Sequence, residues 1–123
     1  MRKTASFATT AVSLAALFAG ASMMPTAAGA ADADTIKYGK EVAFDRKKGN
    51  CLSCHMIADG ESPGDLGPPL IAMKARFPDR EKLRAQIWDP MIANPGTRMP
   101  PFGKYQALSG KEIDAIVDYL YTL

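Results

Sequence analysis

The sequence predicts an all-α domain of three to four helices, and three observations point to this fold class. Apolar residues after Ser109 recur with the 3.6-residue period of an amphipathic helix. Capping residues, glycines and prolines bound the other apolar segments at helix-like intervals. Alternation of apolar and polar residues with a period of two, which marks a half-buried strand, is nowhere sustained. We therefore expect helices joined by proline-rich connections.

The first thirty residues are not expected to belong to this domain. Arg2 and Lys3 precede an uncharged, mostly apolar stretch, and Ala28-Gly29-Ala30 supplies the small residues that a signal peptidase accepts. The apolar stretch is shorter than the about 20 residues of a membrane span, so a membrane anchor is not expected. The sequence thus predicts a removable secretory signal peptide at residues 1–30 and a single domain at residues 31–123.

The basic character of the chain comes from this leader. Residues 31–123 hold 13 basic and 13 acidic residues, so their formal charge is zero, against +2 for the full chain. Nucleic-acid binding is not expected, because it needs a basic patch or stripe. The local cluster Arg46-Lys47-Lys48 has two interpretations: a solvated helix end favoured by the helix dipole, or a docking patch for an acidic partner.

The first helix is expected over about Thr35–Lys48. Asp34 is its predicted N-cap, and Gly49 lies just past its end.

Three further helices are expected toward the C-terminus. A short helix covers Leu70–Phe77, and a longer one, Asp79–Asp89, lies between two prolines that bound it. The last helix follows Ser109, which forms a capping box with Glu112.

Cys51-Leu52-Ser53-Cys54-His55 contains both cysteines and the only histidine of the chain. A Cys51–Cys54 disulfide would close a very short loop and restrict the unfolded chain little. A thioredoxin-like redox pair would sit beside a βαβ pattern, which the sequence lacks. A structural zinc site would need a fourth Cys or His ligand, and none remains.

Covalent attachment of haem c accounts for all three residues. Two thiols three residues apart add to the vinyl groups on one side of a porphyrin, and the histidine that follows becomes an iron ligand. A covalent cofactor would also stabilise a domain of only about 93 residues. We therefore predict a c-type cytochrome with one haem, bound through Cys51 and Cys54 and ligated by His55.

The loop Pro63–Leu70 carries a candidate partner for the histidine. Its prolines stiffen the backbone, and the carbonyl of Pro68 is the expected acceptor for the Nδ1 proton of His55. A surface turn without haem contact is the alternative interpretation.

Met99 is the expected second axial ligand of the iron. It sits in a proline-rich loop before the last helix, whereas Met56 adjoins His55 and must lie on the same side of the haem. Met73 and Met91 are expected to fill the core, with Met91 as the next candidate ligand. If Met99 were not a ligand, a five-coordinate haem that binds peroxide or diatomic gases would be the alternative.

Trp88 is a candidate haem contact with two interpretations. Its indole N–H donates to a haem propionate, or its ring packs on the porphyrin edge within the core. Further candidate propionate partners are Arg76, Arg80 and Arg98.

The Cys51–His55 motif, the Gly-Pro-Pro-Leu turn that ends at Leu70, Met99-Pro100-Pro101-Phe102-Gly103 and the final helix together resemble class I cytochromes c over the whole of residues 31–123. That fold wraps a few helices around one covalently attached haem c. The resemblance also implies that the first and last helices cross closely, a glycine meeting an aromatic residue. Gly39 and Tyr119 are the matching positions.

Finer features resemble the SoxX subunits of the SoxAX sulfur-oxidation cytochromes. The stretches that carry this resemblance are residues 43–52, 63–70, 94–103 and 119–123. It implies a non-catalytic electron-transfer subunit in the periplasm, in a heterodimer with a larger, SoxA-like cytochrome. That partner would join thiosulfate to a cysteine of a SoxYZ-like carrier, as an L-cysteine S-thiosulfotransferase. The electrons would pass through this chain to a small cytochrome c.

The alternative is a free-standing mobile cytochrome c that feeds a terminal oxidase. The zero charge of residues 31–123 argues against it, since mobile carriers use a surface of one sign to steer their encounters.

Overall fold

The computed structural model describes residues 31–123, so the predicted signal peptide lies outside the described residues. The helical elements of this part are α1 (Ala33–Phe44), the 3₁₀ segment η1 (Cys51–Ser53), α2 (Met73–Arg76), α3 (Arg80–Trp88) and α4 (Gly110–Leu120). Residues 31–123 contain no strand, which confirms the all-α prediction. None of the helices among them has the length and apolar character that crossing a membrane requires.

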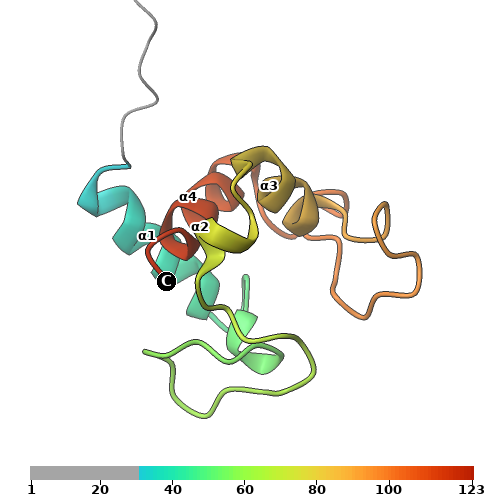
Figure 1. The fold of residues 1–123 in the computed structure, drawn as a ribbon, viewed down its shortest axis with the longest axis horizontal. Helices are drawn as coiled ribbons and strands as arrows, with labels where there is room; N and C mark the ends of the chain where they lie inside the picture. Colours follow the sequence, from blue (N-terminus) through green and yellow to red (C-terminus); the bar gives the residue numbers. More distant parts are fainter. Residues whose placement is uncertain (1–30) are drawn as a thin grey trace, which may run out of the picture.

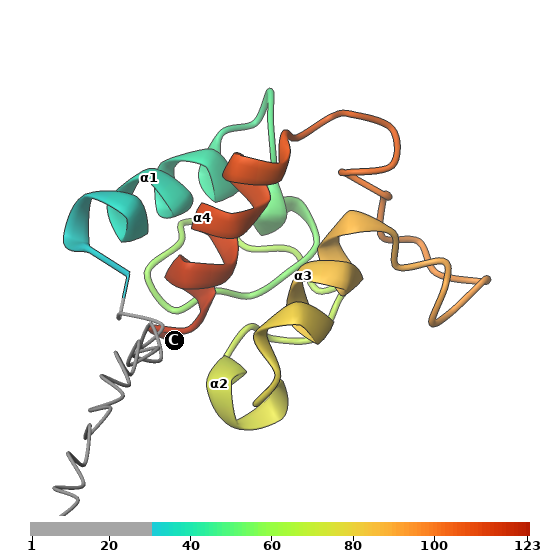
Figure 2. The same ribbon diagram turned by 90° about the horizontal axis from the view of Figure 1, so that it is seen from above.

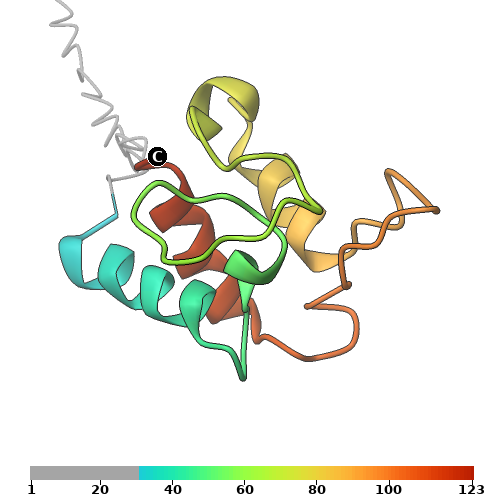
Figure 3. The ribbon, with the colours of Figure 1, turned by 90° about the horizontal axis from the view of Figure 1, so that it is seen from below.

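Two long loops extend from a group of packed helices (Figures 1, 2 and 3). α1 packs against α4, and α3 packs against another side of α4 (Figures 1 and 2). The segment between η1 and α2 makes a wide loop, green to yellow in Figure 3, and the segment between α3 and α4 projects from the helices, orange in Figure 2. The buried core holds Val42, Ala43, Ile57, Leu70, Met73, Leu83, Ile87, Leu108, Ile113, Ile116, Val117, Tyr119 and Leu120.

α1 and α4 cross at Gly39. A Cβ atom on Gly39 would overlap the carbonyl oxygen of Ala115 and lie 3.0 Å from the backbone nitrogen of Ile116, so the two backbones are in direct contact. The ring of Tyr119 packs edge-to-face on Phe44, with centroids 6.0 Å apart. The close crossing is as predicted, but the nearest atoms to the glycine belong to the α4 backbone, and the aromatic contact is made one turn further along α1.

The predicted bounds of the first helix were wrong at both ends. α1 begins at Ala33, after the N-cap Asp32, whose carboxylate accepts a hydrogen bond from the Thr35 backbone N–H at 2.8 Å. It ends at Phe44 because Asp45 starts a turn: its side chain accepts from Lys47 N–H at 2.8 Å. Aspartate favours such turns by bonding the backbone two residues on.

The cluster Arg46-Lys47-Lys48 therefore lies beyond α1 and not in its last turn, where the interpretation as a helix end placed it. All three side chains are exposed. Lys48 is paired with Glu112 of α4, so this ion pair joins the turn after α1 to the start of the last helix.

The remaining helices follow their predicted caps more closely. α2 is shorter than the predicted Leu70–Phe77, while α3 starts after Asp79, whose carboxylate accepts from Glu81 N–H at 3.0 Å. α4 has the predicted capping box: Ser109 Oγ accepts from Glu112 N–H at 3.3 Å, and Glu112 Oε2 accepts from Ser109 N–H at 2.8 Å. The bond from Lys48, followed by those from Ser109, lowers the pKa of Glu112 from its ordinary 4.5 to about 2.

Replacing Gly39 with alanine is expected to destabilise the haem-loaded protein by about 1–3 kcal/mol, because the added methyl group forces the α1 and α4 backbones apart. Urea denaturation at neutral pH measures this free energy of unfolding. Gly110→Ala is the matched control on α4, since Gly110 does not line the cavity and a Cβ there meets only the flexible end of the Arg84 side chain, at 3.3 Å. Equal stability of the two variants would contradict the role of the crossing.

Glu112→Gln is expected to lower the free energy of unfolding by about 1 kcal/mol at pH 6, because it weakens the capping box and removes an ion pair. The pKa of Glu112 is lowered in the folded state, so its ionised form stabilises the fold above pH 4.5, and this contribution is lost as the pH falls toward 2. The stability difference between wild type and variant, measured by urea denaturation from pH 6 to pH 2, should shrink to near zero. A difference that stays constant over this range would contradict the assignment.

Candidate haem site

A cavity of about 850 Å³ lies between the two loops and the helices. This size falls within the range of about 300–1,000 Å³ that is usual for ligand sites. Its apolar wall comes from α2, α3 and α4, through Met73, Leu83, Ile87, Ile116 and Leu120. Most of its polar and sulfur-bearing groups come from η1 and the loops, and Met73 and Arg76 of α2 and Gln86 of α3 add to them. The predicted site residues that line it are Cys51, Cys54, His55, Pro68 and Met99.

His55 is held in one orientation by the loop that follows it. Its Nδ1 lies 2.7 Å from the carbonyl oxygen of Pro68. A carbonyl can only accept, so Nδ1 carries the proton and Nε2 keeps its lone pair for a metal. Gly67 lies against the ring: a Cβ there would be 2.6 Å from Nδ1. The backbone N–H of Gly67 donates to Cys54 at 2.7 Å, which ties the loop to the motif.

The two cysteines lie on and just after η1 and form no disulfide. The N–H groups of Cys54 and His55 both donate to the carbonyl of Cys51, at 3.2 and 2.9 Å. Burial raises the pKa of the Cys51 thiol to about 11. Redox-active Cys-x-x-Cys pairs use a lowered thiol pKa, which is the opposite of the direction at Cys51. Within residues 31–123, no group of three or more His, Cys, Asp or Glu side chains is placed to hold a metal ion.

Met99 lines the cavity from a loop 44 positions after His55 in the sequence. Its backbone N–H donates to Thr97 Oγ1 at 3.2 Å, and its sulfur lies 4.0 Å from Gln86 Nε2. Met91, the alternative ligand, is not among the residues that line the cavity. Met56 is 52% exposed, and Met73 forms part of the buried wall. Of the described methionines, only Met73 and Met99 reach the cavity, and Met99 alone comes from a loop.

Gln86 is a cavity residue that the sequence prediction missed. It lies on α3 between Leu83 and Ile87, on the face that this helix turns to the cavity. The signal was present in the sequence, because an amide interrupts an otherwise apolar helical face at positions 83, 86 and 87.

Trp88 does not have the core position that one of its two predicted roles requires, and its donation to a haem propionate stays a prediction. Trp88 is absent from the cavity lining, and its side chain is 38% exposed. Arg84 stacks over its ring at 5.2 Å from the centroid, and a Cβ on Gly103 would overlap the ring. The physical reason is helical geometry: Trp88 follows the cavity-facing Ile87 by one residue, which rotates it about 100° away.

Of the three candidate propionate partners, two line the cavity and one does not. Arg80 is bound to Asp118 at 2.9 Å and to the backbone of Asp114 at 3.1 Å, away from the cavity. Arg76 and Arg98 do line the cavity, together with the exposed cluster Arg46-Lys47-Lys48. No Asp or Glu of residues 31–123 lines it. Its rim is therefore cationic, which suits an anionic group such as a carboxylate-bearing porphyrin.

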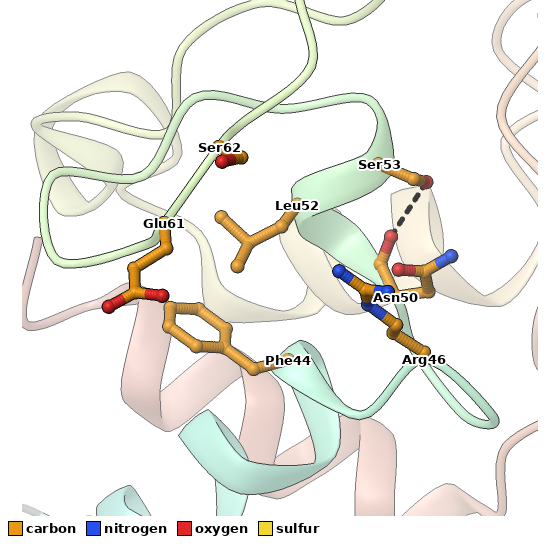
Figure 4. Close-up of a pocket in the computed structure, with 7 residues that line it drawn as sticks. All are labelled: Phe44, Arg46, Asn50, Leu52, Ser53, Glu61 and Ser62. Carbon is orange, nitrogen blue, oxygen red and sulfur yellow. Dashed lines mark hydrogen bonds between the residues drawn. The ribbon is translucent and has the colours of Figure 1, made fainter.

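A second cavity, of about 290 Å³, lies beside η1 (Figure 4). Its walls are Phe44, Arg46, Asn50, Leu52, Ser53, Glu61 and Ser62. No cysteine, histidine or methionine of the described part of the chain lines it, so it holds none of the haem-binding candidates.

The donor set of the larger cavity fits haem c. Two thiols and an imidazole with an accessible Nε2 come from one short segment, and a thioether comes from a separate loop. The apolar wall suits the apolar ring of a haem, and the cationic rim suits the negative propionates at its edge.

Comparisons with known proteins agree with this geometry. The model of a cytochrome family described as cytochrome c oxidase, cbb3-type, subunit III, matches residues 43–120. A chain in the crystal structure of SoxXA from P. pantotrophus superposes with a TM-score of 0.63 at 26% sequence identity. That similarity covers 70% of this chain and 79% of the other. Among curated protein sequences, none matches this chain.

The family match spans the cysteine motif, the cavity wall and the Met99 loop, and the structural match has the class I cytochrome c fold in common with this chain. The chain therefore belongs to the family described as cytochrome c oxidase, cbb3-type, subunit III, and is a SoxX-like electron-transfer cytochrome with covalently bound haem c.

Proposed function

We propose that this chain is the electron-transfer subunit of a periplasmic, two-cytochrome complex that oxidises thiosulfate. The observation that carries the proposal is the placement of His55 and Met99 on separate segments that line the same cavity. Because a ligand is available from each of these segments, the chain has no need to leave an iron position open for substrate. Its work is then to accept and release electrons and not to bind the molecule that is oxidised.

In this proposal Cys51 and Cys54 would hold the cofactor covalently, and His55 Nε2 and Met99 Sδ would ligate its iron. Haem c bound in this way supplies a one-electron couple whose potential is raised by the thioether ligand. The chain itself orients the imidazole through Pro68, covers the ring with apolar side chains, and offers Arg76 and Arg98 to the negative edge. A raised potential suits an acceptor of electrons from sulfur compounds.

The reaction that supplies the electrons is assigned to a larger, SoxA-like partner, in keeping with the similarity to SoxXA. Joining thiosulfate to a cysteine thiol of a SoxYZ-like carrier forms one sulfur–sulfur bond and releases the thiol proton and two electrons. This chain accepts those electrons one at a time and passes them to a small cytochrome c. It contributes no catalytic residue of its own to the L-cysteine S-thiosulfotransferase step. The secretory leader predicted at residues 1–30 would bring it to the periplasm.

Met99→Ala is expected to lower the reduction potential and to allow rapid carbon monoxide binding to the reduced protein, because the soft thioether ligand is lost. Potentiometric titration and flash photolysis measure the two effects. Met56→Ala is the control, since Met56 is exposed beside His55 and does not line the cavity. A Met99→Ala variant with the potential and ligand binding of wild type would contradict the assignment of the axial ligand.

The tagged full-length chain, purified gently from native periplasm, is expected to bring down a larger c-type cytochrome in equal amount. Mass spectrometry and a haem stain of the bands identify it, and thiosulfate added with the carrier protein should then reduce the pair. A single haem band without a partner would contradict the subunit proposal and favour a free-standing carrier that feeds a terminal oxidase.

A further inference from the structure

We infer that Asp89 and Lys104 position the methionine ligand, by closing the base of the loop that carries it. This inference rests on the proposed role of Met99. The Met99 loop comprises residues 90–103, between the end of α3 and Lys104. Asp89 is the buried charged residue of the described chain, with 6% of its surface exposed.

The Asp89 carboxylate bonds both ends of the Met99 loop. Its Oδ2 accepts from Lys104 Nζ at 2.8 Å, just after the loop ends. Its Oδ1 accepts from the backbone N–H of Met91 at 3.2 Å, just after the loop begins. One side chain thus brings together two segments that are thirteen positions apart in the sequence.

Backbone contacts close the base at the same place. The N–H groups of Gly103 and Lys104 both donate to the carbonyl of Trp88, each at 3.2 Å. The Trp88 ring lies so close to Gly103 that a Cβ there would overlap it. These contacts account for the position of Trp88 outside the cavity lining, where it holds the base of the loop.

Within the loop, the backbone N–H groups bond near neighbours, and the one side-chain contact from Met99 to a helix is the long one between its sulfur and Gln86 Nε2, at 4.0 Å. Asn94 N–H donates to Pro90 at 3.0 Å, Thr97 N–H to Asn94 at 3.0 Å, and Met99 N–H to the Thr97 side chain at 3.2 Å. Such bonds shape the loop but do not fasten it to the helices, as is typical of a compact surface loop with closely spaced ends. The position of Met99 therefore depends on the base of the loop together with the packing of Met99 and Phe102 against the core.

Removing Lys104 would leave the buried carboxylate without its cationic partner, which costs more than the loss of an exposed pair. Water must then solvate the Asp89 carboxylate, and it can reach the carboxylate only if the base of the Met99 loop opens. Asp89 raises the pKa of Lys104, in agreement with a charged contact. Opening the base moves the loop, so the sulfur of Met99 leaves its place more readily.

The test measures how easily imidazole, added as a competing ligand, displaces methionine in the oxidised, haem-loaded protein. Lys104→Met and Asp89→Asn are expected to tighten imidazole binding about tenfold, the equivalent of one charge-assisted hydrogen bond. Both should also weaken the long-wavelength absorption band of methionine-ligated ferric haem. Asp89→Asn keeps an acceptor for Met91 N–H, so it removes only the charged contact with Lys104. It provides the test of the inference if Lys104→Met fails to fold.

Lys40→Met is the matched control, because it breaks the Lys40–Asp59 ion pair, which lies away from the cavity lining. It should leave imidazole binding and the absorption band as in wild type, even where its unfolding midpoint falls as far as that of Lys104→Met. Variants of Asp89 and Lys104 that bind imidazole like wild type would overturn the inference and leave the proposed function standing. A wild-type protein without the methionine band would overturn the assignment of Met99, and the inference with it.

Discussion

The direct contact of the α1 and α4 backbones at Gly39 is the constraint on which the rest of the molecule depends. A hydrogen atom in place of a side chain lets α1 lie against Ala115, and the Phe44–Tyr119 ring contact and the Lys48–Glu112 ion pair hold the helices together beyond the crossing. This crossing sets where the turn after α1 delivers η1 with its cysteines. It also sets where Ile116 and Leu120 of α4 form the wall of the cavity.

The helices supply the wall of the site, and the loops supply its chemistry. His55 is oriented by a carbonyl that only a rigid, proline-rich backbone presents in this position, and Met99 comes from a loop closed at its base by Asp89, Lys104 and Trp88. Helices would hold such ligands at fixed spacing along one face, whereas loops allow them to approach the cofactor from separate parts of the chain. Each loop is held by its own contacts. The Gly67 N–H bond to Cys54 holds the Pro68 loop, and the contacts of Asp89, Lys104 and Trp88 hold the Met99 loop.

Charge is distributed unevenly although the formal charge of residues 31–123 is zero. The ionisable side chains on the rim of the haem cavity, other than the ligand candidates, are all cationic: Arg46, Lys47, Lys48, Arg76 and Arg98. Acidic residues lie elsewhere, for example Asp114 and Asp118 of α4, where they bind Arg80 and Arg84. Net charge therefore says little about the surface that a redox partner meets.

The sequence by itself determined the helical class, the capping box at Ser109 and Glu112, and the haem-binding chemistry of Cys51, Cys54 and His55, because each depends on residues that are close together in the chain. Only the tertiary structure decided that Trp88 lies outside the cavity lining, and that Arg76 and Arg98 line the cavity while Arg80 does not. It alone brought Asp89 against Lys104. Those features depend on which side of a helix meets a neighbour and on contacts between distant segments, and packing of the whole chain, not local spacing, selects them.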